Sequence, residues 1–252
     1  MKFEEIYSIV GHVPFITKEN GRYLYDLILR EKLTNILELG IAHGTATCYM
    51  AAALHELGEG SVTAVDLLED KRQPSAEEQI EKAGLSDFAT VTRMQSGYTW
   101  FLHDEIKRNT VDDTCNEVYD LCIIDGPKNW TIDGAAFFFA DKLLRQDAWI
   151  IFDDYGWSYS RVARRRDATD GITHRELSDD EQTIPHVKEI FELLVKQHPN
   201  YSNFSILADS DWAIAQKTAS AEKTYSVIYR EQTKDVFAKV LNKGLEKIKR
   251  KV

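Results

Sequence analysis

The stretch Asn35-Ile36-Leu37-Glu38-Leu39-Gly40-Ile41-Ala42-His43-Gly44-Thr45 predicts a buried strand, a glycine-containing turn and the start of a helix. An apolar run leads into Gly40, Gly44 follows, and Cys48 to Leu54 continues with an alanine-rich helical pattern. Glycine lets the backbone come close to a ligand, and the N-terminus of a helix offers unpaired N–H groups. We therefore expect a ligand-binding turn at residues 40–44.

A second predicted strand, Ser61 to Leu67, follows the helix and carries Asp66 near its end. An acidic residue about 20 positions after such a turn holds a ribose hydroxyl in nucleotide-binding α/β folds. The turn lacks the G-x-G-x-x-G spacing of a dinucleotide fingerprint, because position 42 is Ala. On its own, the G-x-x-x-G spacing is a weak signal, and a tight structural turn is the alternative.

The carboxylate of Glu38 directly before G-x-x-x-G resembles the first motif of the class I S-adenosylmethionine (SAM) methyltransferases. That resemblance implies that the amino-acid end of SAM, rather than a pyrophosphate, lies on the turn. With Asp66 at the following strand end, it makes SAM the expected cofactor.

Composition restricts the remaining classes of function. The 252 residues carry a net charge of −10, and this acidic balance argues against nucleic-acid binding, which requires a basic face. No apolar run is long enough for a transmembrane segment, and the N-terminus lacks the apolar core of a signal peptide. Cys48, Cys115 and Cys122 show no paired spacing, which favours free thiols in a cytoplasmic protein over a disulfide or a zinc site.

Short apolar strands alternate with helical patterns along most of the chain. This alternation predicts an α/β fold with a doubly wound, mostly parallel seven-stranded sheet, Rossmann-like, whose last two strands form an antiparallel edge hairpin. Strands are expected at 35–39, 61–66, 89–94, 118–124, 148–152, 203–207 and 212–216. Helices are expected at 19–33, 45–57, 75–83, 99–107, 133–144 and 187–196.

Two segments fall outside this core. We expect one domain over residues 1–218, with an N-terminal helical cap and an inserted loop at 156–186, and a C-terminal extension over 219–252. A loop of that length is usually functional or disordered. Its arginines, Arg161 and 164–166, form either a solvated face or an anion site. The extension is basic and amphipathic, which favours packing on its own domain or in a homo-oligomer, with a membrane surface as the alternative.

Carboxylates gather at the ends of two predicted strands. Asp125 follows Ile123-Ile124, and Asp153 and Asp154 follow Ile150-Ile151-Phe152. Ligands of open α/β sheets bind outside the carboxyl ends of the strands, so the three side chains should meet beside the Gly40 turn. Like charges in one pocket require a cation, and hard oxygen ligands suit Mg²⁺ or Ca²⁺. The alternative is that Asp153 or Asp154 only caps the next segment.

Three elements follow one another along the chain: Ile124-Asp125-Gly126, an apolar helix, and Ile150 to Tyr155. Together they resemble the metal-dependent O-methyltransferases. The resemblance is closest to the macrocin- and novobiocin-type sugar enzymes and more distant to the catechol type. The resemblance covers residues 15–155 and extends towards 216. It implies that Asp125, Asp153 and Asp154 bind Mg²⁺. It also implies a SAM site formed by Glu38, Gly40, Ala42, His43, Gly44, Thr45, Asp66, Ser96 and Asp125.

Lys128 departs from the sugar-type pattern, in which a histidine commonly follows the first metal aspartate by three residues. The catechol-type enzymes have a lysine there that acts as the general base. Beside a divalent cation and a sulfonium, like charge would lower the pKa of Lys128 and let it accept a hydroxyl proton. The alternative is that Lys128 only balances the carboxylates.

The leading interpretation is a SAM- and Mg²⁺-dependent O-methyltransferase acting on a small hydroxylated molecule, such as a sugar, a glycosylated natural product or a polysaccharide precursor. An oxygenase component resembling cephalosporin hydroxylase is one alternative, although no two-histidine-one-carboxylate group for iron is visible. A non-catalytic scaffold subunit on the same fold is another. Trp130, Tyr155, Trp157 and Tyr159 flank the metal motifs and form either a substrate wall or core.

Overall fold

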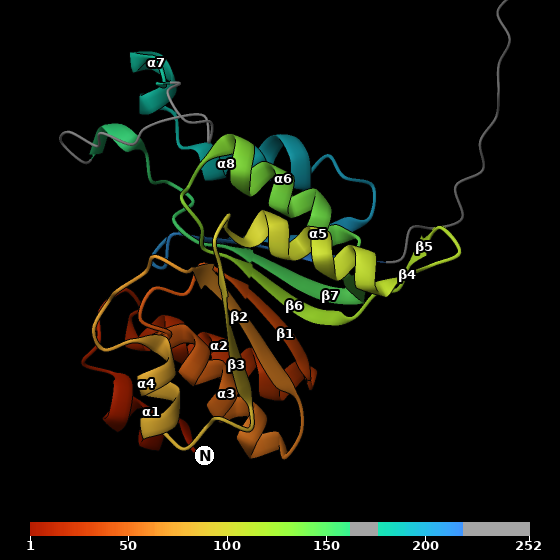
Figure 1. Ribbon diagram of the computed structural model, residues 1–252. Coiled ribbons are helices and arrows are strands. Elements are labelled where there is room, and N and C mark those ends of the chain that lie inside the picture. The colour runs from red at the N-terminus through yellow and green to blue at the C-terminus, as the bar shows by residue number, and fades with distance from the viewer. Residues whose placement is uncertain (162–175, 219–252) are drawn as a thin grey trace, which may run out of the picture. The chain divides into compact units, whose positions relative to one another are not determined.

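The stretch 35–45 begins with an inner strand of the main sheet in the computed structural model, which describes residues 1–161 and 176–218 (Figure 1). β1 (Asn35–Leu39) pairs in parallel with β2 (Ser61–Leu67) on one side and with β6 (Tyr119–Ile124) on the other. α3 (Thr45–Leu57) follows the turn directly. A central parallel strand is covered on both faces, which accounts for its nearly continuous apolar sequence.

The main sheet has seven strands in the order β3-β2-β1-β6-β7-β9-β8. The remaining strands are β3 (Ala89–Met94), β7 (Leu144–Phe152), β8 (Tyr201–Leu207) and β9 (Trp212–Lys217). The first five strands in this order are parallel, and β9 runs antiparallel to both β7 and β8. The predicted α/β fold, with its mostly parallel sheet and edge hairpin, is therefore confirmed. Its strand order reverses between β1 and β6, which is where ligands of such sheets bind.

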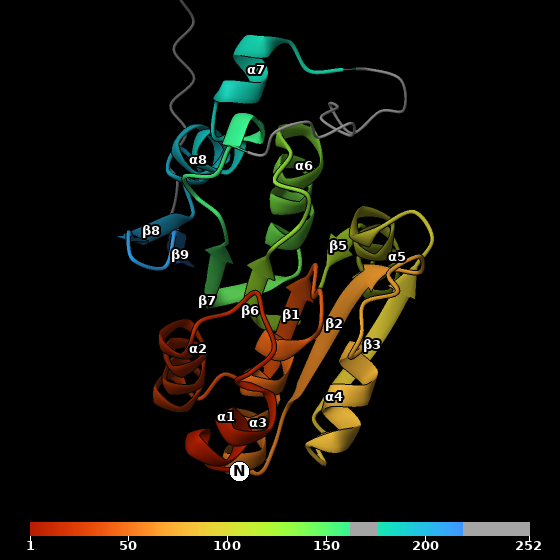
Figure 2. The same ribbon diagram turned by 90° about the vertical axis from the view of Figure 1, so that its left-hand side faces the viewer.

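Helices cover both faces of the sheet (Figures 1 and 2). One apolar core contains buried side chains of α1 (Phe3–Val10), α2 (Lys18–Glu31), α3 and α4 (Ala76–Lys82). The other core contains those of α5 (Tyr98–Asn109), α6 (Trp130–Asp141) and α8 (His186–Ile190), which continues as a π-helical turn over Phe191–Val195. The site discussed below lies at the carboxyl edge of the strands between these layers.

Several local details differ from the predicted elements. β4 (Thr110–Val111) and β5 (Thr114–Cys115) form a hairpin whose strands are too short to show an alternating pattern. α6 begins before residue 133 because the Asn129 side chain caps it, accepting hydrogen bonds from the Thr131 and Ile132 amides at 2.9 and 3.1 Å. The start of this helix is therefore set by a capping residue that is not part of the apolar pattern, and the apolar pattern alone places the start too late.

The predicted insert at 156–186 contains regular structure in its described part. A 3₁₀ turn spans Tyr159–Arg161, and α7 spans Asp179–Thr183. α7 begins with a capping box between Ser178 and Glu181, whose S-x-x-E spacing is visible in the sequence. The prediction of a loop throughout 156–186 is therefore wrong at α7, because a capping sequence starts a helix there.

Some predictions concern residues outside the described ranges. The basic extension 219–252, the arginines 164–166 and the remainder of the insert all lie there, so the boundary at 218 stays a prediction. Within residues 1–161 and 176–218, no helix is long and apolar enough to cross a membrane. The three cysteines are free thiols, as the sequence predicts.

Candidate functional site

The turn after β1 requires glycine at Gly40 for two reasons. Gly40 has a φ of +87°, in the region that favours glycine, and a Cβ there would lie 2.2 Å from the backbone oxygen of Asp125. The Gly40 amide donates to Val65 O at 2.9 Å and the Asp125 amide donates to Leu39 O at 2.8 Å. The end of β1 is therefore packed against the end of β6, which places the glycine turn directly beside Asp125.

We expect Gly40→Ala to lower the free energy of unfolding by about 2 kcal/mol more than Gly58→Ala does, because overpacking adds to the backbone strain. Gly58 is a matched control, since its φ is +84° and a Cβ there would meet nothing within 4 Å. Urea denaturation of both variants measures the difference. Equal losses of stability in the two variants would show that the clash between the added Cβ and the Asp125 backbone is relieved without a cost in free energy.

Asp66 anchors the turn through the backbone. Its Oδ2 accepts hydrogen bonds from the Ile41 and Ala42 amides at 3.0 and 3.1 Å, and its Oδ1 accepts one from the Leu67 amide at 2.7 Å. Ala42 has a φ of +46°, a conformation that these bonds help to hold. Asp66 thus lies at the turn as predicted, and its contacts support the shape of the turn; ribose binding stays a prediction.

A small cavity opens onto the turn. Among the predicted cofactor residues, Glu38, Ala42, His43, Thr45 and Asp125 line it, together with Pro14, Phe15 and Ile16 from the segment between α1 and α2. Sequence reasoning did not assign the latter three to the cofactor site, because only the tertiary fold brings them over the turn. Gly44 lies at the start of α3, and Ser96 lies in the exposed bend between β3 and α5.

Phe15 covers the turn as an exposed aromatic side chain. It has a φ of +80°, is 71% exposed and stacks on His43 with a ring separation of 5.6 Å. His43 is itself fixed, because its Nδ1 is hydrogen-bonded to Pro74 O at 2.7 Å. A bulky residue in this region of φ is strained, and such strain concentrates at ligand sites.

Glu38 lines the cavity and is 1% exposed. Burial raises the pKa of its carboxyl to about 8, although the hydrogen bond donated by Thr47 Oγ1 favours the ionised form. The carboxyl therefore changes charge near neutral pH, and a cationic group bound in the cavity would favour its ionised form.

We expect the cofactor-free protein to lose on the order of 4 kcal/mol of stability between pH 5 and pH 9 through Glu38. The folded protein retains this proton up to about pH 8, whereas the unfolded carboxyl releases it near pH 4.5, so stability falls as pH rises. Glu38→Gln should flatten the dependence, and Glu59→Gln, at an exposed position, should leave it unchanged. Urea denaturation at pH 5, 7 and 9 tests this; parallel curves for wild type and Glu38→Gln would contradict it.

The three predicted metal ligands lie together. Asp125 follows β6, and Asp153 and Asp154 follow β7, whose end is in register with the end of β6 through the pair Ile124 and Phe152. One carboxylate oxygen from each residue lies within 4.8 Å of the others. Three hard oxygen donors at this separation fit a divalent cation such as Mg²⁺.

The ammonium of Lys128 lies among these carboxylates. It is paired with Asp125 and lies 3.5 Å from Asp153 Oδ2 and 3.3 Å from Asp154 Oδ2. Burial would lower the pKa of Lys128, but the three carboxylates outweigh burial and raise it. This is the opposite of the direction expected beside a bound cation. The position of the ammonium shows that the cluster accommodates positive charge.

Two long-range contacts support the acidic cluster and the segment after Lys128, and the sequence predicts neither of them. The Trp212 indole of β9 donates to Asp153 Oδ1 at 2.6 Å. The buried Tyr98 hydroxyl donates to Asp133, whose other oxygen accepts the Asn129 amide at 2.6 Å. Lys128 and Asp154 have φ values of +60° and +58°. The Trp212–Asp153 and Tyr98–Asp133 contacts join residues distant in the chain, and no local sequence pattern indicates them.

The aromatic residues beside the metal motifs lie in different environments. Tyr159 is buried and donates to Pro127 O at 3.1 Å, so it supports the segment that carries Lys128. Tyr155 donates to Glu192 at 2.8 Å, and Trp157 packs edge-on against Tyr159. Trp130 is 40% exposed and lines a separate cavity.

Comparison with known proteins supports the fold. Residues 37–155 match the family model described as a methyltransferase domain. An O-methyltransferase from Bacillus cereus in complex with S-adenosylhomocysteine (SAH) is similar, with 23% identity, a TM-score of 0.58 and coverage of 86% of this chain and 90% of that one. An O-methyltransferase from Streptomyces achromogenes involved in tomaymycin synthesis, in complex with SAM, has 16% identity, a TM-score of 0.57 and coverage of 86% and 88%. No curated protein matches the sequence. The described part of the chain therefore has the α/β fold of the SAM-dependent O-methyltransferases.

Proposed function

We propose that the protein is a SAM- and Mg²⁺-dependent O-methyltransferase that methylates a hydroxyl group of a small molecule. One observation carries the proposal: Asp125 lines the cavity at the glycine turn and also belongs to the acidic cluster. A methyl donor held at the turn and an acceptor oxygen held at the cluster would meet at this residue. Such alignment is the main contribution that a protein makes to a direct transfer between two bound groups.

The turn supplies the features that SAM requires. Gly40 and Gly44 let the backbone of the turn come close to a ligand. The buried carboxyl of Glu38 lines the cavity, where it would bind a cationic amino group. Asp66 holds the Ile41 and Ala42 amides in place. The solved relatives bind SAH and SAM with the same fold, which supports the assignment of the cofactor here.

Asp125, Asp153 and Asp154 would hold Mg²⁺. When bound, such a cation lowers the pKa of a coordinated hydroxyl and orients neighbouring oxygens. Lys128 Nζ lies within 3.5 Å of the Asp153 and Asp154 carboxylates, and we assign it as acceptor of the hydroxyl proton. A bound divalent cation and the SAM sulfonium would oppose the carboxylates that otherwise raise its pKa, so that Lys128 could lose its own proton. Trp212 and the Tyr98–Asp133 pair keep these groups in position.

The acceptor class is inferred from the site. A cluster of hard oxygen ligands favours an acceptor with a hydroxyl and a neighbouring oxygen, as in a sugar, a glycosylated natural product or a polysaccharide precursor. In the described part of the chain, the group of residues close enough to hold a metal contains three aspartates and no histidine. This donor set differs from the two-histidine-one-carboxylate group of non-haem iron oxygenases.

Calorimetric titration of the protein with SAM and SAH, with and without Mg²⁺, tests the proposal. We expect micromolar SAH binding and separate Mg²⁺ binding. Absence of SAM and SAH binding would overturn the methyltransferase assignment. SAM binding without Mg²⁺ binding in the presence of hydroxylated acceptors would remove the metal from the mechanism while keeping methyl transfer.

A further inference from the structure

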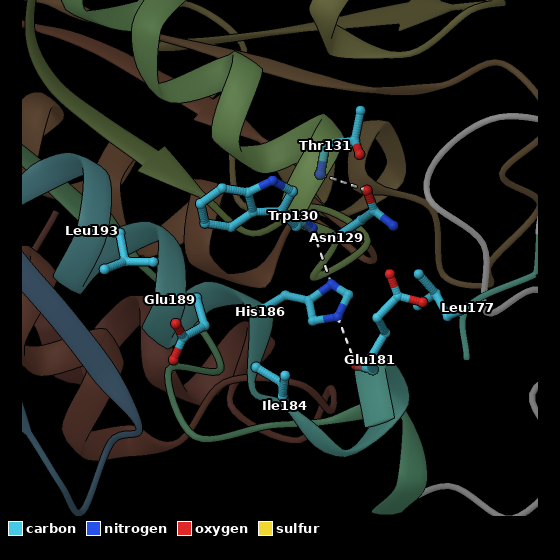
Figure 3. Close-up of a pocket in the computed structure, with 9 residues that line it drawn as sticks. All are labelled: Asn129, Trp130, Thr131, Leu177, Glu181, Ile184, His186, Glu189 and Leu193. Atoms are coloured by element: carbon cyan, nitrogen blue, oxygen red, sulfur yellow. Dashed lines mark hydrogen bonds between the residues drawn. The ribbon is translucent and has the colours of Figure 1, made fainter. Parts of the chain in front are cut away.

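A second cavity lies where the start of α6, the segment around α7 and helix α8 meet (Figure 3). Its volume is about 290 Å³. The lining residues come from the start of α6, from the segment around α7, and from α8 and the turn that follows it: Asn129, Trp130, Thr131, Leu177, Glu181, Ile184, His186, Glu189 and Leu193. Since ligand pockets usually range from about 300 to 1,000 Å³, this cavity is sized for one ring-bearing part of a molecule.

The polar wall of the cavity is already hydrogen-bonded. His186 is buried; its Nδ1 accepts the Trp130 amide at 3.1 Å, so its Nε2 donates to Glu181 O at 2.9 Å (Figure 3). The Asn129 carbonyl oxygen is used in capping α6. These groups give the cavity a defined shape, and recognition must therefore come mainly from its remaining walls.

Those remaining walls are apolar and acidic. Trp130, Ile184 and Leu193 are 40–45% exposed, although side chains of this kind are normally buried. Glu181 and Glu189 supply two carboxylates, and among the residues that the structure describes the lining contains no lysine or arginine. Glu181 is held as an anion, because Ser178 donates to its Oε2 through both N and Oγ at 2.7 Å. Charge complementarity favours an apolar ring that carries a cation.

The cavity is one layer of side chains away from the Lys128 segment. Asn129 and Trp130 directly follow Lys128 in the chain, and Tyr159 donates to Pro127 O at 3.1 Å while its ring meets His186 edge-on at 5.3 Å. The cavity therefore adjoins the segment that positions Lys128.

We propose that this cavity binds the part of the acceptor that is not methylated, and that this part is a ring system bearing a protonated amine. The assignment to the acceptor depends on the proposed function, whereas binding of the ring and amine depends only on the cavity. The acceptor is thus an amino-substituted molecule, with its hydroxyl at the acidic cluster and its ammonium near Glu181 and Glu189.

Two probes with the same ring and opposite charge test this directly: tryptamine and 3-indolepropionate. Titration into ¹⁵N-labelled full-length protein, followed at the Trp130 amide and indole signals assigned with Trp130→Phe, measures both affinities. We expect tryptamine to bind at least about fivefold more tightly, because two partly exposed carboxylates favour the cation and oppose the anion. Equal affinities, or no binding of either probe, would overturn the proposal.

Variants separate the cavity from the overall negative charge of the protein. Glu181→Gln with Glu189→Gln should bring the two affinities within about twofold of each other. The control Glu59→Gln with Glu69→Gln removes the same charge at exposed positions outside the cavity and should keep the preference. A preference that survives the first pair of substitutions would contradict the proposal. Glu189→Gln alone provides a second test in which the capping box of α7 is intact.

Ile184→Arg fills the cavity with a long cationic side chain and should weaken tryptamine binding more than about tenfold. Its melting temperature and SAH affinity should equal those of wild type, because Ile184 is exposed and lies outside the turn cavity. In the wild-type protein, absence of tryptamine selectivity together with normal SAH binding would refute the cavity assignment alone, as would an Ile184→Arg variant that binds tryptamine as tightly as wild type. Selective tryptamine binding without SAH binding would refute the proposed function and leave an amine-binding cavity.

Discussion

The Asp153→Asn, Asp154→Asn double variant is expected to bind Mg²⁺ at least about 100-fold more weakly than wild type. Substitution of groups that only support a metal ligand already costs about 10- to 100-fold in affinity, and this variant removes two of three carboxylates. Asparagine retains an oxygen for the Trp212 indole and tolerates the positive φ of residue 154, so the fold should be unchanged. Calorimetric titration with Mg²⁺ measures the effect.

The turn between β4 and β5 offers a matched control for this variant. Asp112 and Asp113 are adjacent, exposed and have φ values of +46° and +65°. Asp112→Asn with Asp113→Asn therefore makes the same change of charge and residue type on a similar backbone, and should leave Mg²⁺ affinity unaltered. An affinity of the Asp153, Asp154 variant within about threefold of wild type would show that the cluster is not the metal site.

Lys128→Met is expected to produce three separable effects. Without metal, it leaves three carboxylates with no cation, and stability should fall by about 2 kcal/mol. This is below the value for a fully buried pair, because the carboxylate side chains are 24–39% exposed and solvent screens them. Mg²⁺ affinity should rise, since the ammonium no longer competes for the same oxygens. Methyl transfer should fall by about 100-fold or more if Lys128 is the base.

Denaturation in EDTA, calorimetry with Mg²⁺ and turnover of an acceptor found by screening measure these effects separately. Lys128→Arg is the control, because it keeps the positive charge but cannot release a proton at ordinary pH. It should therefore preserve stability while losing turnover. Turnover of Lys128→Met within about threefold of wild type would remove the base role and leave charge balance as the function of this residue.

The sheet and its glycine turn could be predicted because local sequence determines them. The apolar run of β1 is continuous since both faces of a central parallel strand are covered, and Gly40 is required where the backbone adopts a positive φ. The proximity of Asp125, Asp153 and Asp154 was also predictable, since carboxyl ends of neighbouring parallel strands share one edge. These inferences need only strand periodicity and one rule of topology.

The bounds of several helices were less predictable because caps, rather than periodicity, set them. The start of α6 depends on the Asn129 side chain, and α7 depends on Ser178 and Glu181. Both caps are visible as residue types, but each type is common in loops as well. An apolar stripe identifies that a helix exists far better than it identifies where that helix begins.

By itself, the sequence determined the α/β fold, the turn at Gly40 and the set of three carboxylates, because each follows from residues close in the chain or at equivalent strand ends. Only the tertiary structure decided what surrounds them. Phe15 over His43, Trp212 on Asp153, Tyr98 on Asp133 and the cavity between Trp130 and Ile184 each join residues distant in the chain. Such contacts form when elements pack, and packing depends on the shapes of whole layers, which no local pattern of residues specifies.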